Sequence, residues 1–309
     1  MKEHWQKTLC QQLAGDCLPN EPLAALTTWK VGGCAELLVR PRHEQDLSLL
    51  AEVIRDHELP WWVLGGGSNV LISERGVAGI VIQMSGFDAI TSLAENRLQV
   101  GAGCSLARLV RYGVEHGQQG LEALAGVPGT VGGAIVGNAG AGGQEIGERV
   151  VNVSVWTPSQ REAFQCWSRQ ECRFAYRHSA LSSDHVVVAA TLKLLPADAV
   201  EMRQRMEQAL AHRRQAHAVG GPNAGSVFKN PPAGQAWKLI DQCGLRGMKV
   251  GNAQVSPQHA NFIINTGGAT AEEIYQLIHD VQSTVARHTG VVLEPEVRMI
   301  GSFGEEHDI

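Results

Sequence analysis

Two hydrophobic patterns alternate in the first quarter of the chain. Residues 43–57 carry apolar side chains at the spacing of one helical face, namely Leu47, Leu50, Val53 and Ile54. Pro60 ends this predicted helix, and the apolar stretch 61–64 behind it is predicted to be a strand. Another strand is predicted at 35–39, before the helix. This order describes a strand–helix–strand unit, whose two strands are expected to run parallel.

The rest of the chain predicts mixed α and β structure without internal repeats. Strands are expected at 70–72, 79–83, 150–156, 186–194, 260–264 and 291–298. Helices are expected at 198–212, 237–243 and 270–290, and a strand, a turn and a helix at 98–110. Thr270 and Glu273 form a capping box before the last helix, and Gly290 ends it. Asp198, with Glu201 in position for a second capping box, is taken as the boundary of a new domain.

Residues 126–143 are rich in glycine, with eight in eighteen positions. Glycine loses more freedom on folding than any other residue, so such a run is expected where a large ligand lies against the backbone. Its N–H groups can hold anions, and Thr130 and Asn138 add hydrogen-bonding side chains. A flexible linker would lack the interleaved apolar residues Val127, Val131, Ile135 and Val136. The run therefore predicts the bed of a phosphate-bearing cofactor.

A second glycine-rich turn, 65–69, reads GGGSN and is followed by strand rather than helix. The dinucleotide fingerprint GxGxxG would need glycine at position 70, where the chain has Val70. In the stretch 98–110, Leu106 stands where the third glycine must be, so that stretch is interpreted as structural. For 65–69, a nucleotide-binding turn of another kind is favoured over a plain hairpin.

The composition is typical of an ordinary globular protein. A length of 309 residues predicts two or three domains, with 44% hydrophobic and 18% charged residues. Lys and Arg number 26 against 31 Asp and Glu, a net charge of −5, and no basic block occurs. Nucleic acid is therefore not expected as a partner, and a small-molecule partner is expected instead.

Seven cysteines occur without a CxxC pair, so free, buried thiols in a reducing cytosol are expected rather than disulfides or a zinc site. His178 and His259 have no partner at metal-ligand spacing, and no metal is expected. The N-terminal residues lack an apolar signal region, and no run of about eighteen apolar residues occurs. A cytoplasmic protein is expected.

Five stretches together resemble the UDP-N-acetylenolpyruvoylglucosamine reductase family. They are GGGSNVLI at 65–72, AGVPGTVGGAIVGNAGAGG at 125–143, FAYRHS at 174–179, GSVFKNP at 225–231 and LEPEVRMIG at 293–301. Five motifs in family order are hard to obtain by chance, although each one alone is weak to moderate. The likeness extends from about Leu26 to Gly301.

The resemblance implies an α+β fold, with a two-subdomain FAD-binding module of the vanillyl-alcohol-oxidase type and a C-terminal substrate-binding domain. On this chain the FAD-binding subdomains are expected at 1–84 and 85–197 and the substrate domain at 198–292. The tail 293–309 is expected to return to the first subdomain.

The resemblance also implies an NADPH-driven oxidoreductase with non-covalent FAD. Its reaction would reduce the enolpyruvyl ether of UDP-N-acetylglucosamine to the lactyl ether of UDP-N-acetylmuramate, a step in peptidoglycan precursor synthesis. The expected partners are the UDP-sugar and NADPH, without a membrane or an obligatory protein partner.

Residue roles also follow from the resemblance. The FAD diphosphate and flavin would be lined by Gly65, Gly66, Gly67, Ser68, Asn69, Val70, Gly126, Val127, Pro128, Gly129, Thr130, Gly132, Gly133, Asn138, Ala139 and Gly140. Arg213 or Arg214 would reach the flavin, and the spacing does not choose between them. Ser226 would donate a proton, and Arg177 and Glu296 would polarise the substrate. The substrate would also be held by Tyr176, Lys229, Asn230 and, as a weaker candidate, His259.

Two departures from the family pattern affect the substrate side. Gly142 stands where the family often has tyrosine, so local substrate packing is expected to differ. The segment between Arg177 and the strand at Val186 has no room for the long tyrosine-bearing lid of one subgroup. The chain therefore resembles the shorter, lidless subgroup.

The proposed roles suit the chemistry. Hydride addition to one carbon of an enol ether places negative charge on the next carbon and its carboxylate, where the permanently charged fork of Arg177 would act. Serine is a weak acid, so Ser226 needs help, and Lys229 is a plausible helper; a turn serine is the alternative. Glu296 and Arg298 fall on one face of a strand, so a structural ion pair competes with a catalytic role.

Two other functions compete with the reductase. One is another flavoprotein oxidase or dehydrogenase of this fold acting on a hydroxy acid, and the motifs at 225–231 and 293–298 speak against it. The other is a non-catalytic binding protein for flavin or a nucleotide sugar. The intact set of Ser226, Arg177 and Glu296 argues against that reading.

Overall fold

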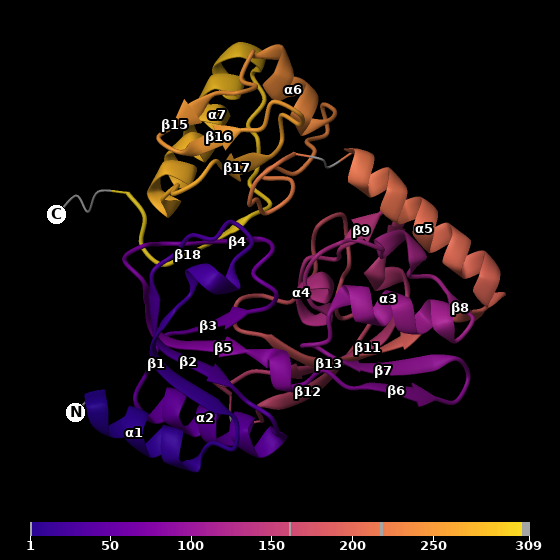
Figure 1. Ribbon diagram of the computed structural model, residues 1–309. Coiled ribbons are helices and arrows are strands. Elements are labelled where there is room, and N and C mark those ends of the chain that lie inside the picture. Colours follow the sequence, from indigo (N-terminus) through magenta and orange to yellow (C-terminus); the bar gives the residue numbers. More distant parts are fainter. Residues whose placement is uncertain (1, 161, 217–218, 305–309) are drawn as a thin grey trace. The chain divides into compact units, whose positions relative to one another are not determined.

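The computed structural model describes residues 2–160, 162–216 and 219–304 (Figure 1). The chain forms two compact units. The first contains Met1–Pro19, Leu37–Gly66 and Gly79–Gln215, and the second contains Asn20–Glu36, Gly67–Ala78 and Ala216–Ile309. The predicted division at 84, 197 and 292 stays a prediction, and residues 305–309 of the predicted tail lie outside the described residues.

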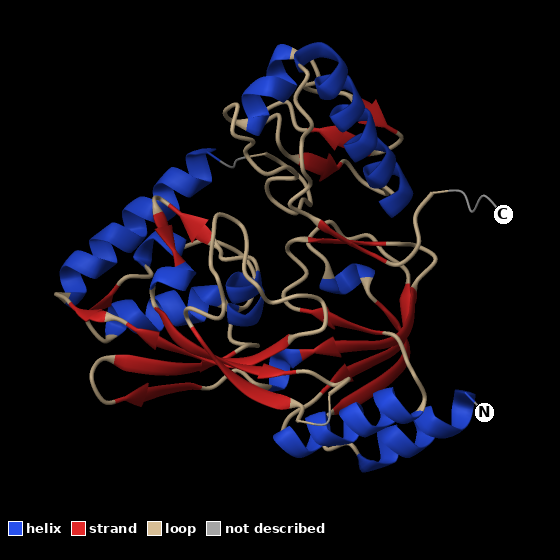
Figure 2. Ribbon diagram, turned by 180° about the vertical axis from the view of Figure 1, so that it is seen from behind, coloured by secondary structure: helices blue, strands red, loops and turns tan. Residues whose placement is uncertain are grey.

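One sheet, most of whose residues belong to the first unit, has the strand order β1-β2-β5-β3. Its strands are β1 (Asp16–Pro22), β2 (Cys34–Arg40), β5 (Val77–Gln83) and β3 (Trp61–Leu64). Helices α1 (Lys2–Gln12) and α2 (Glu44–Asp56) lie side by side along one face of it (Figures 1 and 2). The predicted strands 35–39 and 61–64 and the helix between them are confirmed. The parallel partner of β3 is β5, which stands between β2 and β3.

A five-stranded sheet of order β12-β11-β13-β7-β6 forms the other half of this unit. Its strands are β6 (Ile90–Leu93), β7 (Arg97–Gly101), β11 (Val150–Trp156), β12 (Phe164–Ser168) and β13 (Val186–Lys193). Smaller elements are β8 (Gln118–Gln119), β9 (Gly140–Ala141), β10 (Gln144–Glu145) and β14 (Leu195–Pro196). The helices are α3 (Leu106–Glu115), α4 (Val131–Val136) and α5 (Ala199–Ala216). The strand, turn and helix predicted at 98–110 are confirmed, whereas β6 and β12 were not predicted.

The second unit is built around the long helix α7 (Ala271–Thr289). Its other elements are α6 (Ala236–Gln242), β4 (Val70–Ile72), β15 (Lys249–Val250), β16 (Ala253–Val255), β17 (Ile263–Asn265) and β18 (Arg298–Ile300). The Thr270–Glu273 capping box and the left-handed Gly290 end are both present, as predicted. The strand predicted at 291–298 is wrong for most of its length, because Pro295 forms only an isolated bridge with Phe228 and a strand, β18, begins at the end, where it pairs in parallel with β4. The predicted strand 260–264 is displaced, because Phe262 N–H turns back to the His259 carbonyl before β17 begins.

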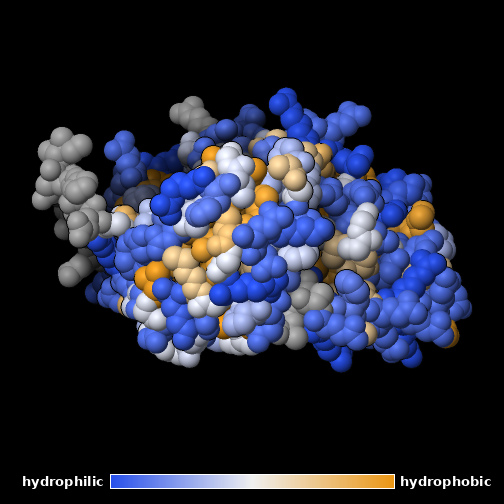
Figure 3. Space-filling model, turned by 90° about the horizontal axis from the view of Figure 1, so that it is seen from above, coloured by the Kyte–Doolittle hydropathy of each residue, from blue (hydrophilic) through white to orange (hydrophobic). Residues whose placement is uncertain are grey.

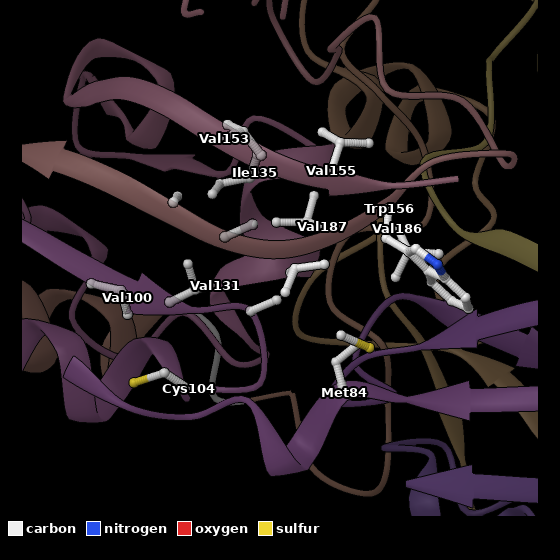
Figure 4. Close-up of a cluster of buried hydrophobic side chains, with 14 of the residues drawn as sticks. Met84, Val100, Cys104, Val131, Ile135, Val153, Val155, Trp156, Val186 and Val187 are labelled. Carbon is white, nitrogen blue, oxygen red and sulfur yellow. The ribbon is translucent and has the colours of Figure 1, made fainter. Parts of the chain in front are cut away.

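Each unit has its own hydrophobic core. In the first, Val131 and Ile135 of α4 lie among side chains of β7, β11 and β13, together with Met84 and Trp156 (Figure 4). In the second, the core gathers around the buried face of α7 and includes the fully buried Trp29. Hydrophilic side chains cover most of the face shown in Figure 3, with apolar ones in smaller areas between them.

The prediction that all seven cysteines are free and buried holds in full for only two of them, Cys104 and Cys172. Cys10 and Cys17 form a disulfide, because the end of α1 and the start of β1 bring their Cα atoms to 5.3 Å, within bonding range. Cys34 and Cys166 are free but exposed. Sequence spacing carried no sign of this pair, since it depends on how a helix end meets a strand.

Candidate functional site

The glycine run folds into a capped helix rather than a linker. Thr130 accepts a hydrogen bond from Gly133 N–H at 3.4 Å and begins α4. Val131 and Ile135 are fully buried, and Val127 and Val136 pack at the edge of the same core. The interleaved apolar residues therefore hold the run in place, as predicted.

The two glycine-rich turns meet within the first unit. A Cβ atom added to Gly66 would lie 2.9 Å from Gly129 Cα, and one added to Gly65 would lie 2.9 Å from Thr130 Oγ1. Only glycine permits this approach of two backbones. Gly66 thus lies directly against the backbone of Gly129, and Gly65 against the side chain of Thr130.

Two neighbouring glycines of α4 have different surroundings. A Cβ on Gly132 would lie 3.0 Å from Ala102 Cβ and 3.3 Å from the Ala102 carbonyl oxygen, so this residue faces the protein core. A Cβ on Gly133 would have only Thr130 Oγ1 near it, at 3.7 Å. Of the two, Gly133 is the one with open space beside it.

Asn138 is fully buried, and its side chain is engaged with the protein. Its Nδ2 donates to Glu145 Oε2 at 2.6 Å and to the Ala175 carbonyl at 2.9 Å. Its Oδ1 accepts from Gly147 N–H at 3.1 Å. The side chain joins three segments of the first unit, and a direct contact with the cofactor stays a prediction.

Tyr176 and Arg177 lie at the tip of a two-residue turn. Ala175 and His178 close the turn with paired backbone hydrogen bonds of 3.0 and 2.9 Å. Arg177 has a φ of +53°, a region that non-glycine residues seldom adopt. Its guanidinium donates from Nη2 to the Gly140 carbonyl at 3.2 Å and lies 5.4 Å from the centre of the Tyr176 ring. The two predicted residues are thus brought to the end of the glycine run.

Arg213 is the better flavin candidate of the two arginines in α5. Its Cδ would lie 3.0 Å from a Cβ on Gly126, so it packs against the start of the glycine run. Burial, and then the positive charge of Arg177, lower the pKa of Arg213 below its usual value. Arg214 is exposed. Two arginines that repel each other, one packed against Gly126 and one bonded to the Gly140 carbonyl, favour an anionic ligand.

The second unit contains the remainder of the GGGSN turn. Gly67 accepts a hydrogen bond from Thr28 N–H at 2.9 Å through its carbonyl. Asn69 Nδ2 donates to the Glu296 carbonyl at 3.0 Å, and its own carbonyl accepts from Arg298 N–H at 3.1 Å. Val70, which follows Ser68 and Asn69, is paired with Arg298 between β4 and β18. This motif therefore holds the chain that carries Glu296.

Ser226 lies on a loop that is fixed from both sides. The next residue, Val227, is fully buried, and its carbonyl accepts from Glu296 N–H at 2.7 Å. Asn261 then brackets Phe228, accepting from its N–H at 3.0 Å and donating to its carbonyl at 2.8 Å. Ser226 and Glu296 are thereby neighbours in one unit.

Lys229 and Asn230 continue this loop. Lys229 Nζ forms an ion pair with Glu294 Oε1 at 2.6 Å, with about a quarter of the Lys229 side chain exposed (24%). Asn230 Oδ1 accepts from Ala236 N–H at 3.0 Å and so supports the start of α6. Both residues keep their predicted substrate roles as predictions.

His259 is half-buried on the same unit. Its Nδ1 accepts from Asn261 N–H at 3.3 Å, and its ring packs edge-on against Phe262 at 4.6 Å. Burial lowers the pKa of His259. These contacts support Asn261, and through it the loop of Ser226. The substrate role of His259 stays a prediction.

The predicted site residues are divided between the two units. Arg177, Tyr176 and Arg213 belong to the first unit, and Ser226, Lys229, Asn230, His259 and Glu296 to the second. Burial lowers the pKa of Arg298, the residue expected on the same strand face as Glu296. Among the described residues, no group of three or more His, Cys, Asp or Glu could hold a metal.

Sequence reasoning did not find the residues that support these groups. Asn261, Glu145 and Ser179 had no assigned role, although Asn261 brackets Phe228 and Ser179 Oγ donates to the Val136 carbonyl at 2.8 Å. Their bonds reach across 7 to 43 residues of sequence, so no local pattern points to them. Only the place of Ser179 inside the family-like motif FAYRHS could have drawn notice to it.

Family models match both parts of the chain. Residues 35–161 match the FAD binding domain, and residues 215–300 match the C-terminal domain of UDP-N-acetylenolpyruvoylglucosamine reductase. No helix of the described residues has the length and apolar character needed to cross a membrane.

Similar proteins agree with these matches. The UDP-N-acetylenolpyruvoylglucosamine reductase of Syntrophotalea carbinolica is 44% identical, over 91% of this chain and 93% of its own. The reductase of Geotalea uraniireducens is 42% identical over 97% of this chain and 99% of its own. The crystal structure of the reductase from Thermus caldophilus covers 94% of this chain and 100% of its own, with 33% identity and a TM-score of 0.78.

The fold and the glycine bed define an FAD-binding oxidoreductase, with an α+β cofactor module followed by a separate C-terminal domain. The predicted fold class is confirmed. The chain belongs to the UDP-N-acetylenolpyruvoylglucosamine reductase family.

Proposed function

We propose that the protein reduces the enolpyruvyl ether of UDP-N-acetylglucosamine to the lactyl ether of UDP-N-acetylmuramate, with FAD as cofactor and NADPH as reductant. The observation that carries this proposal is the close approach of Gly65 and Gly66 to Gly129 and Thr130. Two half-buried arginines contact the same glycine run, Arg213 at Gly126 and Arg177 at Gly140. Family membership supports the choice of reaction. We infer a cytoplasmic location, because NADPH is a cytoplasmic reductant.

The residues present fit a bound FAD. In the glycine run, Gly133 has space beside it for a ligand, and the close approach of Gly66 to Gly129 leaves no room for a side chain. Gly65, Gly66, Gly129, Thr130 and Gly133 would hold the cofactor. When bound, FAD supplies the hydride that adds to one carbon of the enolpyruvyl double bond.

Arg177 is proposed to bind the substrate carboxylate. Negative charge develops on the carbon beside the site of hydride addition and spreads into this carboxylate, so a fixed cation there acts where charge appears. The guanidinium suits the task because it is planar and keeps its charge. Glu296 would complete the polarisation of the substrate from the segment held by Asn69 and Val227.

Ser226 is proposed to give its hydroxyl proton to the adjacent carbon. Because serine is a weak acid, it can protonate only a strongly basic carbanion, and its alkoxide needs a nearby positive charge. Lys229 is three residues away on the same fixed loop and could supply that charge. In this structure Lys229 is paired with Glu294, so substrate binding would compete with that ion pair.

The function is tested with purified protein. Its absorbance spectrum should show flavin that acid releases as FAD, and NADPH oxidation should depend on the enolpyruvyl UDP-sugar. Oxidation that instead needs a hydroxy acid or oxygen would favour the alternative oxidase or dehydrogenase. Bound flavin without turnover on any of these substrates would favour a binding protein.

A further inference from the structure

The turn that carries Arg177 is held to the glycine run at several points. Asn138 Nδ2 donates to the Ala175 carbonyl, two residues before Arg177. On the other side of the turn, Ser179 is nearly buried, at 6% exposure, and donates to the Val136 carbonyl. The guanidinium itself donates to the carbonyl of Gly140. Three bonds thus join residues 175–179 to residues 136–140.

Asn138 is the centre of this arrangement. It lies two residues from Gly140, it is fully buried, and both ends of its carboxamide are hydrogen-bonded to protein. It also has a φ of +43°, a conformation that asparagine tolerates better than most residues. Its side chain therefore serves the packing of the Arg177 turn, and is not turned toward a ligand.

We propose that Asn138 is a positioning residue for Arg177, which fixes the guanidinium for the substrate carboxylate and has no direct part in holding FAD. This inference rests on the proposed function. Arg177 has a backbone conformation that is costly for a non-glycine residue, and such conformations persist only where the surroundings enforce them. The bond from Asn138 to the Ala175 carbonyl is one of the contacts that enforces it.

The test variant is Asn138→Gly, since glycine accepts the positive φ while removing all three side-chain bonds. Its matched control is Asn96→Gly. Asn96 has a φ of +55° in the same unit, and its side chain is exposed. The two variants make the same chemical change, and only one touches the Arg177 turn.

Binding to the oxidised holoenzyme separates the possible roles. Asn138→Gly should weaken equilibrium binding of the enolpyruvyl UDP-sugar roughly 10-fold or more, because Arg177 no longer meets its carboxylate in the correct place. Binding of UDP-N-acetylglucosamine should be unchanged, because this sugar has no such carboxylate. FAD content and flavin reduction by NADPH should match the wild type and the Asn96→Gly control.

A double-mutant cycle with Arg177→Ala gives a second readout. If Asn138 acts through Arg177, then Asn138→Gly should add no further loss of substrate binding once Arg177 is replaced. A purely structural role would give additive losses, together with a lower melting temperature and weaker binding of both sugars.

Three results would overturn the inference. They are loss of FAD in Asn138→Gly, equal weakening of both sugars, and unchanged binding of the enolpyruvyl sugar. The proposed function is tested separately, on the wild-type holoenzyme. It is wrong if that enzyme does not bind and turn over the enolpyruvyl sugar.

Discussion

The role of several single residues in this protein cannot be recognised from the residue type alone. Gly132 and Gly133 are adjacent and chemically identical, yet one faces Ala102 in the core and the other faces open space. Ser226 is an ordinary turn residue by sequence, yet its loop is hydrogen-bonded to the segment that carries Glu296. Predictions at this scale therefore depend on what each side chain would touch.

Gly133→Val should abolish FAD retention while leaving the fold intact. Its added Cβ meets no protein atom closer than Thr130 Oγ1 at 3.7 Å, so the new side chain would occupy the proposed cofactor space. Gly132→Val should instead lower the melting temperature of the apoprotein, because its Cβ would press on Ala102 at 3.0 Å. Acid-released flavin and thermal unfolding by circular dichroism measure the two effects. Wild-type FAD content in Gly133→Val would show that the bed lies elsewhere.

Ser226→Ala should slow flavin reoxidation by the enolpyruvyl sugar by about 10²–10⁴-fold, the usual cost of a lost general acid. Flavin reduction by NADPH should hardly change, because that half-reaction needs no proton at the substrate carbon. Ser226→Cys should recover part of the loss, since a thiol is more acidic and nearly as small. Stopped-flow absorbance follows both half-reactions. Equal slowing of the two would make Ser226 a structural turn residue.

At the scale of elements, helix ends position the functional loops. Thr270 Oγ1 accepts from Glu273 N–H at 3.1 Å, and Glu273 Oε2 accepts from Thr270 N–H at 3.1 Å. Glu74, which follows β4, adds bonds to the N–H groups of Ala271 and Glu272. The cap of α7 thus also ties this helix to the strand next to the GGGSN turn.

Thr270→Ala should lower the free energy of unfolding by about 1 kcal/mol, the usual loss for an N-cap hydroxyl. Ser283→Ala is the control, because Ser283 is exposed in the middle of the same helix and alanine is the better helix former. Urea unfolding measures both variants. If Thr270→Ala is as stable as Ser283→Ala, the bonds from Glu74 to the first N–H groups of α7 are sufficient without the Thr270 hydroxyl.

At the scale of the whole molecule, the chain passes between its two units after residues 19, 36, 66, 78 and 215. The second unit therefore depends on segments far apart in sequence. Trp29 is fully buried in the second unit, and its side-chain Nε1 donates to the Ile263 carbonyl at 2.7 Å. The backbone carbonyl of Trp29 accepts from Asn265 Nδ2 at 3.0 Å. Strand β4 supplies the partner of β18.

A fragment of residues 216–304 should consequently fail to fold by itself. It lacks Trp29, strand β4 and the carboxylate of Glu74, and so loses core area, a strand partner and part of a helix cap. Circular dichroism should show no cooperative thermal transition in the fragment, in contrast to the full chain. A cooperative transition would support an autonomous C-terminal domain, as the division at 198–292 assumes.

The sequence by itself determined the elements with strong periodicity or clear end signals. The helix over 44–56 and the helix after Thr270 were predicted because apolar spacing and capping residues are local properties. Short strands such as β15 and β16 have two and three residues, too few for a period to show. The five motifs carried the family, and with it the candidate residues, because their order along the chain is also a property of sequence.

The tertiary structure alone decided what those residues touch. Nothing local distinguishes Arg213 from Arg214, yet one packs against Gly126 and the other is exposed. Nothing local distinguishes a cofactor-facing asparagine from Asn138, whose partners lie 7, 9 and 37 residues away. Likewise, the Cys10–Cys17 disulfide depends on the meeting of α1 and β1. The physical reason is common to all three: hydrogen bonds and covalent bonds form between neighbours in space, and sequence pattern reports only neighbours along the chain.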